Sequence, residues 1–183
     1  MNPLEKIDKM GLPITWKLIE IGLQGSRKIP KVLICSDVID YLDYSLVHIC
    51  PQIDKIIKLL CYREDQIKVN ELIREHAEQE TTNWSLQQRK WRVYLLQSCL
   101  EFLPDDCLQG LMELMEFWIS MGNPKDSPLD LPTGTGILES QCYFTPSEYQ
   151  MQLKKNRLWL DQEITAIQKA ERLNYDIFNR KIK

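Results

Sequence analysis

Residues 91–121 constrain the fold of this chain most strongly, because two apolar patterns with helical spacing meet there at Pro104-Asp105. The apolar residues after this break recur as they would on one broad face of a helix. They are Cys107, Leu108, Leu111, Met112, Leu114, Met115, Trp118 and Ile119. Neither pattern contains a recognisable chemical motif. The segment predicts two helices joined by a short turn and leaves the function open.

The N-terminal third of the chain shows the same helical spacing. We expect a helix over residues 14–24 that ends near Gly25, and a second helix with Ser36 as its N-cap. Pro51 is suited to the first turn of a short third helix. The apolar residues expected on one side of that helix are Ile53, Ile56, Ile57, Leu60 and Cys61.

Two further helices are predicted over residues 64–80 and 84–103. The first aligns Val69, Leu72, Ile73, His76 and Ala77 on one side. The second has a wider apolar arc, which indicates burial on several sides. Its apolar residues are Trp91, Tyr94, Leu95, Leu96, Cys99, Leu100 and Phe102.

Residues 122–144 interrupt this pattern with three prolines and three glycines, which predicts a long irregular loop. A helix is expected to resume at about 145–175, with Thr145 as N-cap, Pro146 at its first position and Glu148 completing a capping box. No convincing strand pattern occurs. We therefore predict a single all-α domain over residues 1–183, built as an irregular bundle or a short solenoid-like stack of antiparallel helix pairs.

The composition is that of a soluble globular protein, with 44% hydrophobic and 27% charged residues. Its apolar runs are too short to span a bilayer and its start does not resemble a signal peptide, so we expect no membrane association and a cytoplasmic location. The six cysteines form no C-x-x-C pair and lie on apolar faces. We expect them to be reduced core residues and not zinc ligands.

Several segments, taken in order, resemble a known bacterial family. They are ITWKLIEIGLQ, SDVIDYL, KWRVYLL, FWISMGNPKDSP and YFTPSEYQMQL, spread over about residues 14–160. This order is similar to that of the bacterial domain-of-unknown-function family 2247. The resemblance implies a bacterial, cytosolic helical domain with no assigned activity and no catalytic residues. It also implies that the chain is a candidate immunity protein that neutralises a secreted toxin.

The residues show no signature of catalysis, a cofactor or a resident metal. The chain has only two histidines, His48 and His76, and lacks the H-E-x-x-H and G-x-S-x-G patterns. The TGTG string at 133–136 lacks the lysine of a phosphate-binding loop. We therefore expect no catalytic, cofactor-binding or metal-binding residues. An enzyme assembled from distant helices, with His76, Glu75 and cysteines around a pocket, stays open as an alternative.

Charge is the strongest indication of a partner. Residues 101–148 contain nine carboxylates and one lysine, a net charge of −8, whereas residues 154–183 carry +4. The acidic segment would attract a basic protein, such as a toxin, by electrostatic steering. The candidate partner-binding residues are Asp105, Asp106, Glu113, Glu116, Asp126 and Asp130.

Two other interpretations of these charges stay open. The basic segment 154–183 would pack beside the acidic one, or both would be solvated. A nucleic-acid-binding protein that uses the basic segment is a weaker alternative, because the acidic segment opposes it. The leading hypothesis is a non-catalytic protein-binding module.

Overall fold

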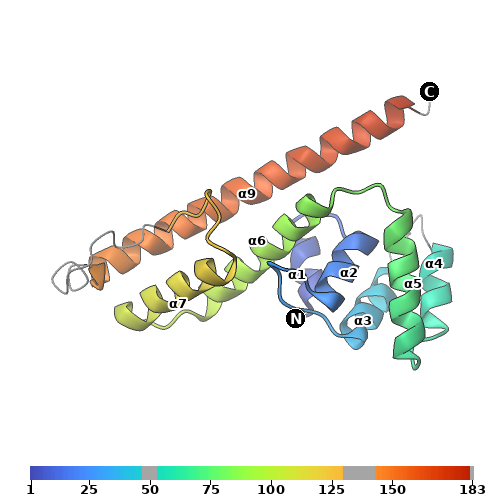
Figure 1. Ribbon diagram of the computed structural model, residues 1–183, viewed down its shortest axis with the longest axis horizontal. Coiled ribbons are helices and arrows are strands. Elements are labelled where there is room, and N and C mark those ends of the chain that lie inside the picture. Colours follow the sequence, from blue (N-terminus) through green and yellow to red (C-terminus); the bar gives the residue numbers. More distant parts are fainter. Residues whose placement is uncertain (47–52, 130–142, 182–183) are drawn as a thin grey trace. The chain divides into compact units, whose positions relative to one another are not determined.

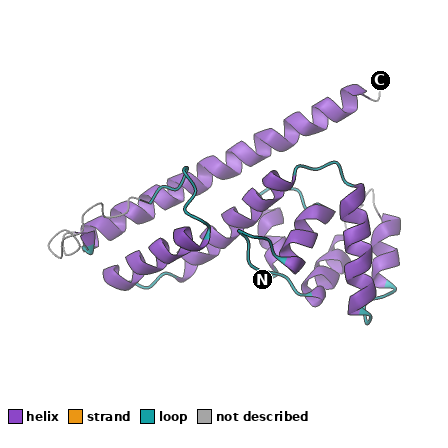
Figure 2. Cartoon of the chain, viewed as in Figure 1, coloured by secondary structure: helices purple, strands orange, loops and turns teal. Residues whose placement is uncertain are grey.

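The computed structural model describes the backbone of residues 1–46, 53–129 and 143–181, and the side chains of 1–44, 54–129 and 143–173. These residues form helices and connecting loops, with no strand among them (Figure 2). The predicted all-α fold is therefore confirmed. The helices labelled in Figure 1 are α1 (Pro3–Lys9), α2 (Trp16–Gln24), α3 (Cys35–Leu46), α4 (Ile53–Leu60), α5 (Gln66–Gln79), α6 (Trp84–Phe102), α7 (Cys107–Ser120) and α9 (Pro146–Lys181).

The chain divides into two compact units, Met1–Tyr94 and Leu95–Lys183, and the boundary falls within α6. In unit 1, α2 packs on α5, while α3 contacts α1, α4 and α5. In unit 2, α7 packs on α9. No helix in the described parts of either unit combines the length and the hydrophobicity that a membrane span requires.

A contact between distant residues fixes the start of α2 in unit 1. The Thr15 hydroxyl accepts a hydrogen bond from the Leu18 amide, as an N-cap does. The Glu80 carboxylate accepts two more, at 2.9 Å each, from the amides of Trp16 and Lys17. A carboxylate at this position also interacts favourably with the helix dipole. The predicted end of this helix is confirmed, because Gly25 follows it at φ 76°.

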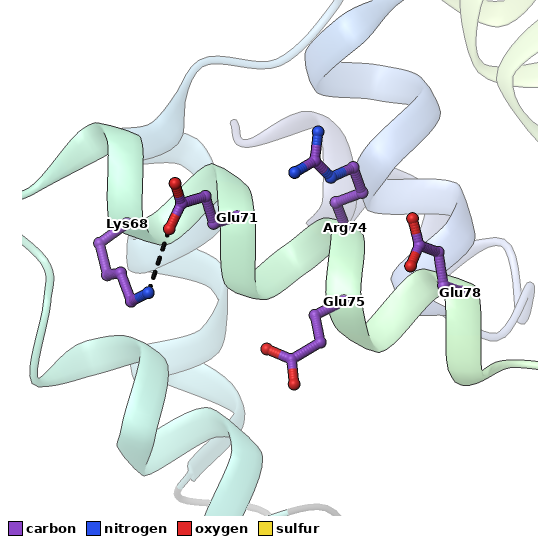
Figure 3. A pocket seen from close by; sticks show the side chains of 5 residues that line it. All are labelled: Lys68, Glu71, Arg74, Glu75 and Glu78. Atoms are coloured by element: carbon purple, nitrogen blue, oxygen red, sulfur yellow. Dashed lines mark hydrogen bonds and ion pairs between the residues drawn. The ribbon is translucent and has the colours of Figure 1, made fainter.

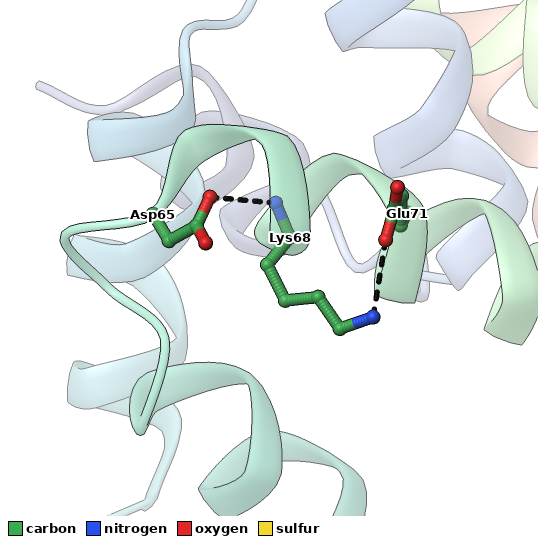
Figure 4. Close-up of polar contacts among 3 residues, drawn as sticks. All are labelled: Asp65, Lys68 and Glu71. Carbon is green, nitrogen blue, oxygen red and sulfur yellow. Dashed lines mark hydrogen bonds and ion pairs between the residues drawn. The ribbon is translucent and has the colours of Figure 1, made fainter.

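The α5 prediction is confirmed residue by residue, since Val69, Leu72, Ile73, His76 and Ala77 are its buried side chains. The helix begins after Asp65, whose carboxylate accepts a hydrogen bond from the Lys68 amide at 3.0 Å. The Lys68 ammonium also pairs with Glu71 on the exposed side (Figure 4).

Three details of the predictions for α3, α4 and α6 are wrong. Helix α3 begins at Cys35, so Ser36 lies inside it, and the Asp37 carboxylate accepts a hydrogen bond from the Ile34 amide just before the helix. Ile57 on α4 and Cys61 just after it are exposed, and the helix buries Leu59 in addition to the predicted Ile56. The predicted Pro51, at the start of α4, lies outside the described residues.

The third wrong detail concerns α6, where Phe102 is 80% exposed near the end of the helix. The same helix buries two polar residues, Gln87 and Lys90, that its apolar pattern does not reveal. The Lys90 ammonium donates a hydrogen bond of 2.6 Å to the Pro13 carbonyl, 77 residues away in sequence. This contact within unit 1 offsets part of the cost of burying a charge.

The start of α9 agrees with its sequence, except that the predicted capping box does not form. Pro146 is the first residue of α9 and the Thr145 hydroxyl accepts a hydrogen bond from the Glu148 amide at 3.2 Å. The Glu148 carboxylate does not return a bond to Thr145; it accepts one from the Gln152 amide group at 2.7 Å. Of the predicted loop 122–144, residues 122–129 contain no helix, and most of the remainder lies outside the described residues.

Candidate functional site on helix α7

Helix α7 is positioned by an N-cap and by four buried residues. The Asp106 carboxylate accepts a hydrogen bond from the Gln109 amide at 2.9 Å, which caps the helix after the Pro104-Asp105 break. The residues that face the core of unit 2 are Gly110, Leu111, Leu114 and Trp118. The exposed residues of α7 lie on the other sides of the helix.

Two contacts hold α7 against α9. The Tyr149 ring lies so close to Gly110 that a Cβ at that position would overlap it, and its hydroxyl donates a hydrogen bond to the Pro104 carbonyl at 2.7 Å. Further along, the indole Nε1 of Trp118 donates to the Asn156 Oδ1 at 2.8 Å. Both Trp118 and Asn156 are fully buried. These contacts fix the rotation of α7 about its axis, and hence which residues it exposes.

The predicted acidic residues fall into three groups. Asp106, Glu113 and Glu116 are spaced i, i+7 and i+10 and share one side of α7, with Gln109 between the first two. Asp105, which immediately precedes Asp106, is also exposed. We call Asp105, Asp106, Glu113 and Glu116 the α7 acidic row.

The other two predicted residues are not part of this row. Asp126 is exposed in the segment that follows α7. Asp130 lies outside the described residues.

Among the described residues, no lysine or arginine forms an ion pair with the α7 acidic row. The Asp106 carboxylate accepts the amide of the N-cap bond, and the Glu113 carboxylate accepts a hydrogen bond from the Gln109 side chain at 3.2 Å. Within unit 2, the exposed basic residues of α9, such as Lys154 and Arg157, therefore do not pair with the row.

The carboxylates of the row also influence groups in the core of unit 2. Burial raises the pKa of the Cys99 thiol to about 11, and the negative charge of Glu113 contributes. Burial likewise raises the pKa of the Tyr149 phenol, with contributions from Asp105 and Glu113. Both effects have the sign expected for a region of negative potential.

An exposed apolar stripe lies beside the acidic row, and the sequence analysis missed it. Leu108, Met112 and Ile119 are 48%, 55% and 59% exposed, although all three were predicted on the same broad apolar face as the buried Leu111 and Trp118. We call these three residues the α7 apolar stripe. The width of the predicted apolar arc could have indicated that some of these residues are exposed, because a helix packed on one layer buries a stripe of about 100°.

His76, named in the alternative enzymatic site, is buried against an aromatic ring. This side chain is 5% exposed, its ring lies 5.0 Å from the Trp16 ring, and neither of its nitrogens has a hydrogen-bond partner among the described residues. The neighbouring Glu75 is exposed. Among the described residues, no group of three His, Cys, Asp or Glu side chains is arranged to hold a metal ion.

The remaining predicted candidates are scattered. Cys35, Cys61, Cys99 and Cys107 are free thiols, and Cys61 is exposed, which corrects the expectation of a buried core residue. His48, Cys50 and Cys142 lie outside the described residues. The exposed bases of α9 in the described part are Lys154, Arg157, Lys169 and Arg172.

A second charged surface lies on α5. A shallow cavity of about 400 Å³ is lined by charged side chains that project from this one helix (Figure 3). They are Lys68, Glu71, Arg74, Glu75 and Glu78. Because cations and anions alternate along it, this surface has little net charge, and it has the character of a solvated helix face.

These observations define an all-helical protein that exposes an acidic row and an apolar stripe on one helix. The chain belongs to the bacterial family described as "Uncharacterized protein conserved in bacteria (DUF2247)", whose model matches residues 4–164. The family resemblance seen in the sequence is thereby confirmed. No curated protein and no solved structure matches the chain.

Proposed function

We propose that this chain is a non-catalytic protein-binding module that uses the α7 acidic row to bind a basic protein. The observation that carries the proposal is the absence of any ion pair between the row and the described lysines and arginines. Carboxylates that lack a cationic partner along one side of a helix steer a basic protein toward it and select it over acidic competitors.

In its more specific form, the proposal makes the chain an immunity protein that neutralises a basic toxin in the cytoplasm. A toxin that acts on nucleic acid carries a basic substrate-binding surface, and a row of carboxylates is complementary to such a surface. The family description, which assigns no activity, leaves this role open. The α5 surface is a less favourable site, because its lysine and arginine offset its acids.

The test is co-purification of the full chain with the basic products of its neighbouring genes. The test variant carries Asp105→Lys and Glu116→Lys, two exposed residues that have no hydrogen-bonding role in α7. A matched control carries Glu64→Lys and Glu75→Lys, two exposed acids of unit 1. Both variants change the net charge equally, so that only the position of the change differs.

We expect one basic product to co-purify in a 1:1 complex. The α7 variant should weaken this complex at least about tenfold, since each reversed pair contributes roughly 1 kcal/mol, and the control should change it less than about twofold. Equal weakening by both variants would refute the α7 site. The toxin form further requires that the partner alone arrests growth, and that the wild-type chain but not the α7 variant restores it.

A further inference from the structure

The α7 apolar stripe is the strongest unexplained feature of the described surface. Its residues, together with the half-buried Met115, are spaced i, i+4, i+7 and i+11. They therefore form a nearly straight line on the helix, about 16 Å long at 1.5 Å per residue. Leu108, Met112 and Ile119 each expose about half or more of a large apolar side chain, whereas an isolated exposed apolar residue would be unremarkable.

We propose that the α7 apolar stripe receives an amphipathic helix of the partner protein, with basic residues along one edge of that helix. This inference rests on the proposed function and names the element of the partner that binds. A helix fits a straight, convex apolar line better than an extended peptide does, because rows of side chains spaced i and i+4 pack between those of a second helix.

The charges beside the stripe specify the basic edge. Glu113 follows Met112 by one residue and Glu116 follows Met115 by one residue, so both carboxylates lie about 100° further around the helix than the stripe. The opposite edge of the stripe adjoins the buried face, which contains Leu111 and Trp118. Cations on the partner therefore find carboxylates on one side only.

This arrangement has the anatomy of a protein interface, with an apolar centre and a charged rim. The stripe would supply the desolvated contacts that set the lifetime of the complex, and the acidic row would supply the rate of encounter and the register. A second copy of the chain is a poorer occupant of the stripe, because its own α7 carries carboxylates and no basic residue.

The probe for the test is a set of three fluorescein-labelled 18-residue peptides. The first has leucines spaced i, i+4, i+7 and i+11, with lysines along one edge. The second has the same composition in scrambled order, and the third has glutamates in place of the lysines. Fluorescence anisotropy with the full chain measures the affinity for each peptide. We expect the first peptide to bind at least about tenfold more tightly than either of the others.

Two variants locate the binding. Met112→Asp changes the middle of the stripe, and Ile119→Asp changes its C-terminal end. Both positions are exposed. Circular dichroism checks that each variant keeps its helicity. Ile67→Asp on α5 is the matched control, since Ile67 is 75% exposed. Each stripe variant should weaken binding of the first peptide at least about tenfold, and the control less than about twofold.

Three outcomes would overturn the inference. If the scrambled peptide binds equally well and only the Asp105→Lys, Glu116→Lys variant weakens it, the acidic row binds cations without a helix, and the proposed function survives. If none of the α7 changes affects binding, both proposals fail. If sedimentation shows a dimer that Met112→Asp dissociates, the stripe is covered by a second copy of the chain.

Discussion

The indole ring of Trp91 lies directly over Gly22 in unit 1, and its Nε1 donates a hydrogen bond of 2.8 Å to the Leu18 carbonyl one turn earlier on α2. Trp91 is fully buried. Tyr149 and Gly110 form a similar contact in unit 2. In both units a helical glycine leaves room for an aromatic ring whose polar atom then bonds to a backbone carbonyl.

Replacing Gly22 with alanine should destabilise the protein. The new Cβ would overlap the Trp91 ring and approach the Leu33 Cδ1 to 2.7 Å. We expect a loss of about 1–3 kcal/mol in the free energy of unfolding, measured by urea denaturation. Gln24→Ala, at an exposed position of the same helix, is the control and should change it by less than about 0.5 kcal/mol. Helix propensity alone favours alanine over glycine, so a more stable Gly22→Ala protein would contradict the contact.

Replacing Asn156 with alanine should destabilise unit 2. The change removes the acceptor of the Trp118 indole and leaves a buried N–H group unpaired, at a cost of about 2–3 kcal/mol. Chemical denaturation followed by circular dichroism measures it. In a Trp118→Phe background there is no N–H group to leave unpaired, and the cost of Asn156→Ala should fall by about 1 kcal/mol. An unchanged cost would show that the hydrogen bond does not contribute.

His76 should make the stability depend on pH. Burial lowers the pKa of this imidazole in the folded protein, with the positive charges of Lys55 and Lys58 contributing and Glu75 opposing. The unfolded chain therefore takes up the proton first, as the pH falls through the ordinary histidine pKa of about 6.5. We expect the free energy of unfolding to decrease between pH 7.5 and pH 5.5.

His76→Leu tests the origin of this decrease, because leucine keeps an apolar contact with Trp16 and cannot be protonated. The variant should lose less stability than the wild type over the same pH range, measured by urea titration at each pH. His48 is present in both proteins and serves as an internal control for histidine titration in general. Parallel pH profiles for the two proteins would refute the assignment.

The free thiols should differ in reactivity. Cys61 is exposed, whereas burial and Glu113 raise the pKa of Cys99 to about 11, so that at pH 8 only about one Cys99 thiol in a thousand is ionised. Alkylation followed by peptide mass spectrometry should find Cys99 at least about a hundredfold slower than Cys61. Glu113→Gln should accelerate Cys99 while leaving Cys61 unchanged. Equal rates at the two thiols would contradict the burial of Cys99.

Local patterns predicted the helices well, and what they could not predict depends on tertiary contacts. The α5 stripe was correct because its polar and apolar residues separate cleanly around one helix. The buried face of α7 is narrower than its apolar pattern, since the contacts of Gly110 with Tyr149 and of Trp118 with Asn156 decide which of its apolar residues are buried. The burial of Lys90 depends on the Pro13 carbonyl, which no local pattern identifies.

The acidic row could be predicted from the sequence in part. Its charge and its position after the Pro104-Asp105 break could be read from the sequence, whereas the absence of ion pairs required the structure. The apolar stripe beside it was hidden because exposed and buried apolar residues follow the same spacing on α7.

The carboxylate of Glu80 has a consequence for the order in which the chain matures during translation. It is bonded to amides more than 60 residues earlier in the sequence, so the ribosome must synthesise α3, α4 and α5 before the first turn of α2 receives these bonds. A nascent chain that stops before this residue keeps the Thr15 N-cap but lacks both bonds to Glu80. The first turn of α2 is thus completed only after a later part of the same unit has been synthesised. We expect a truncated product to fray at the start of α2 and to be cleaved there by proteases.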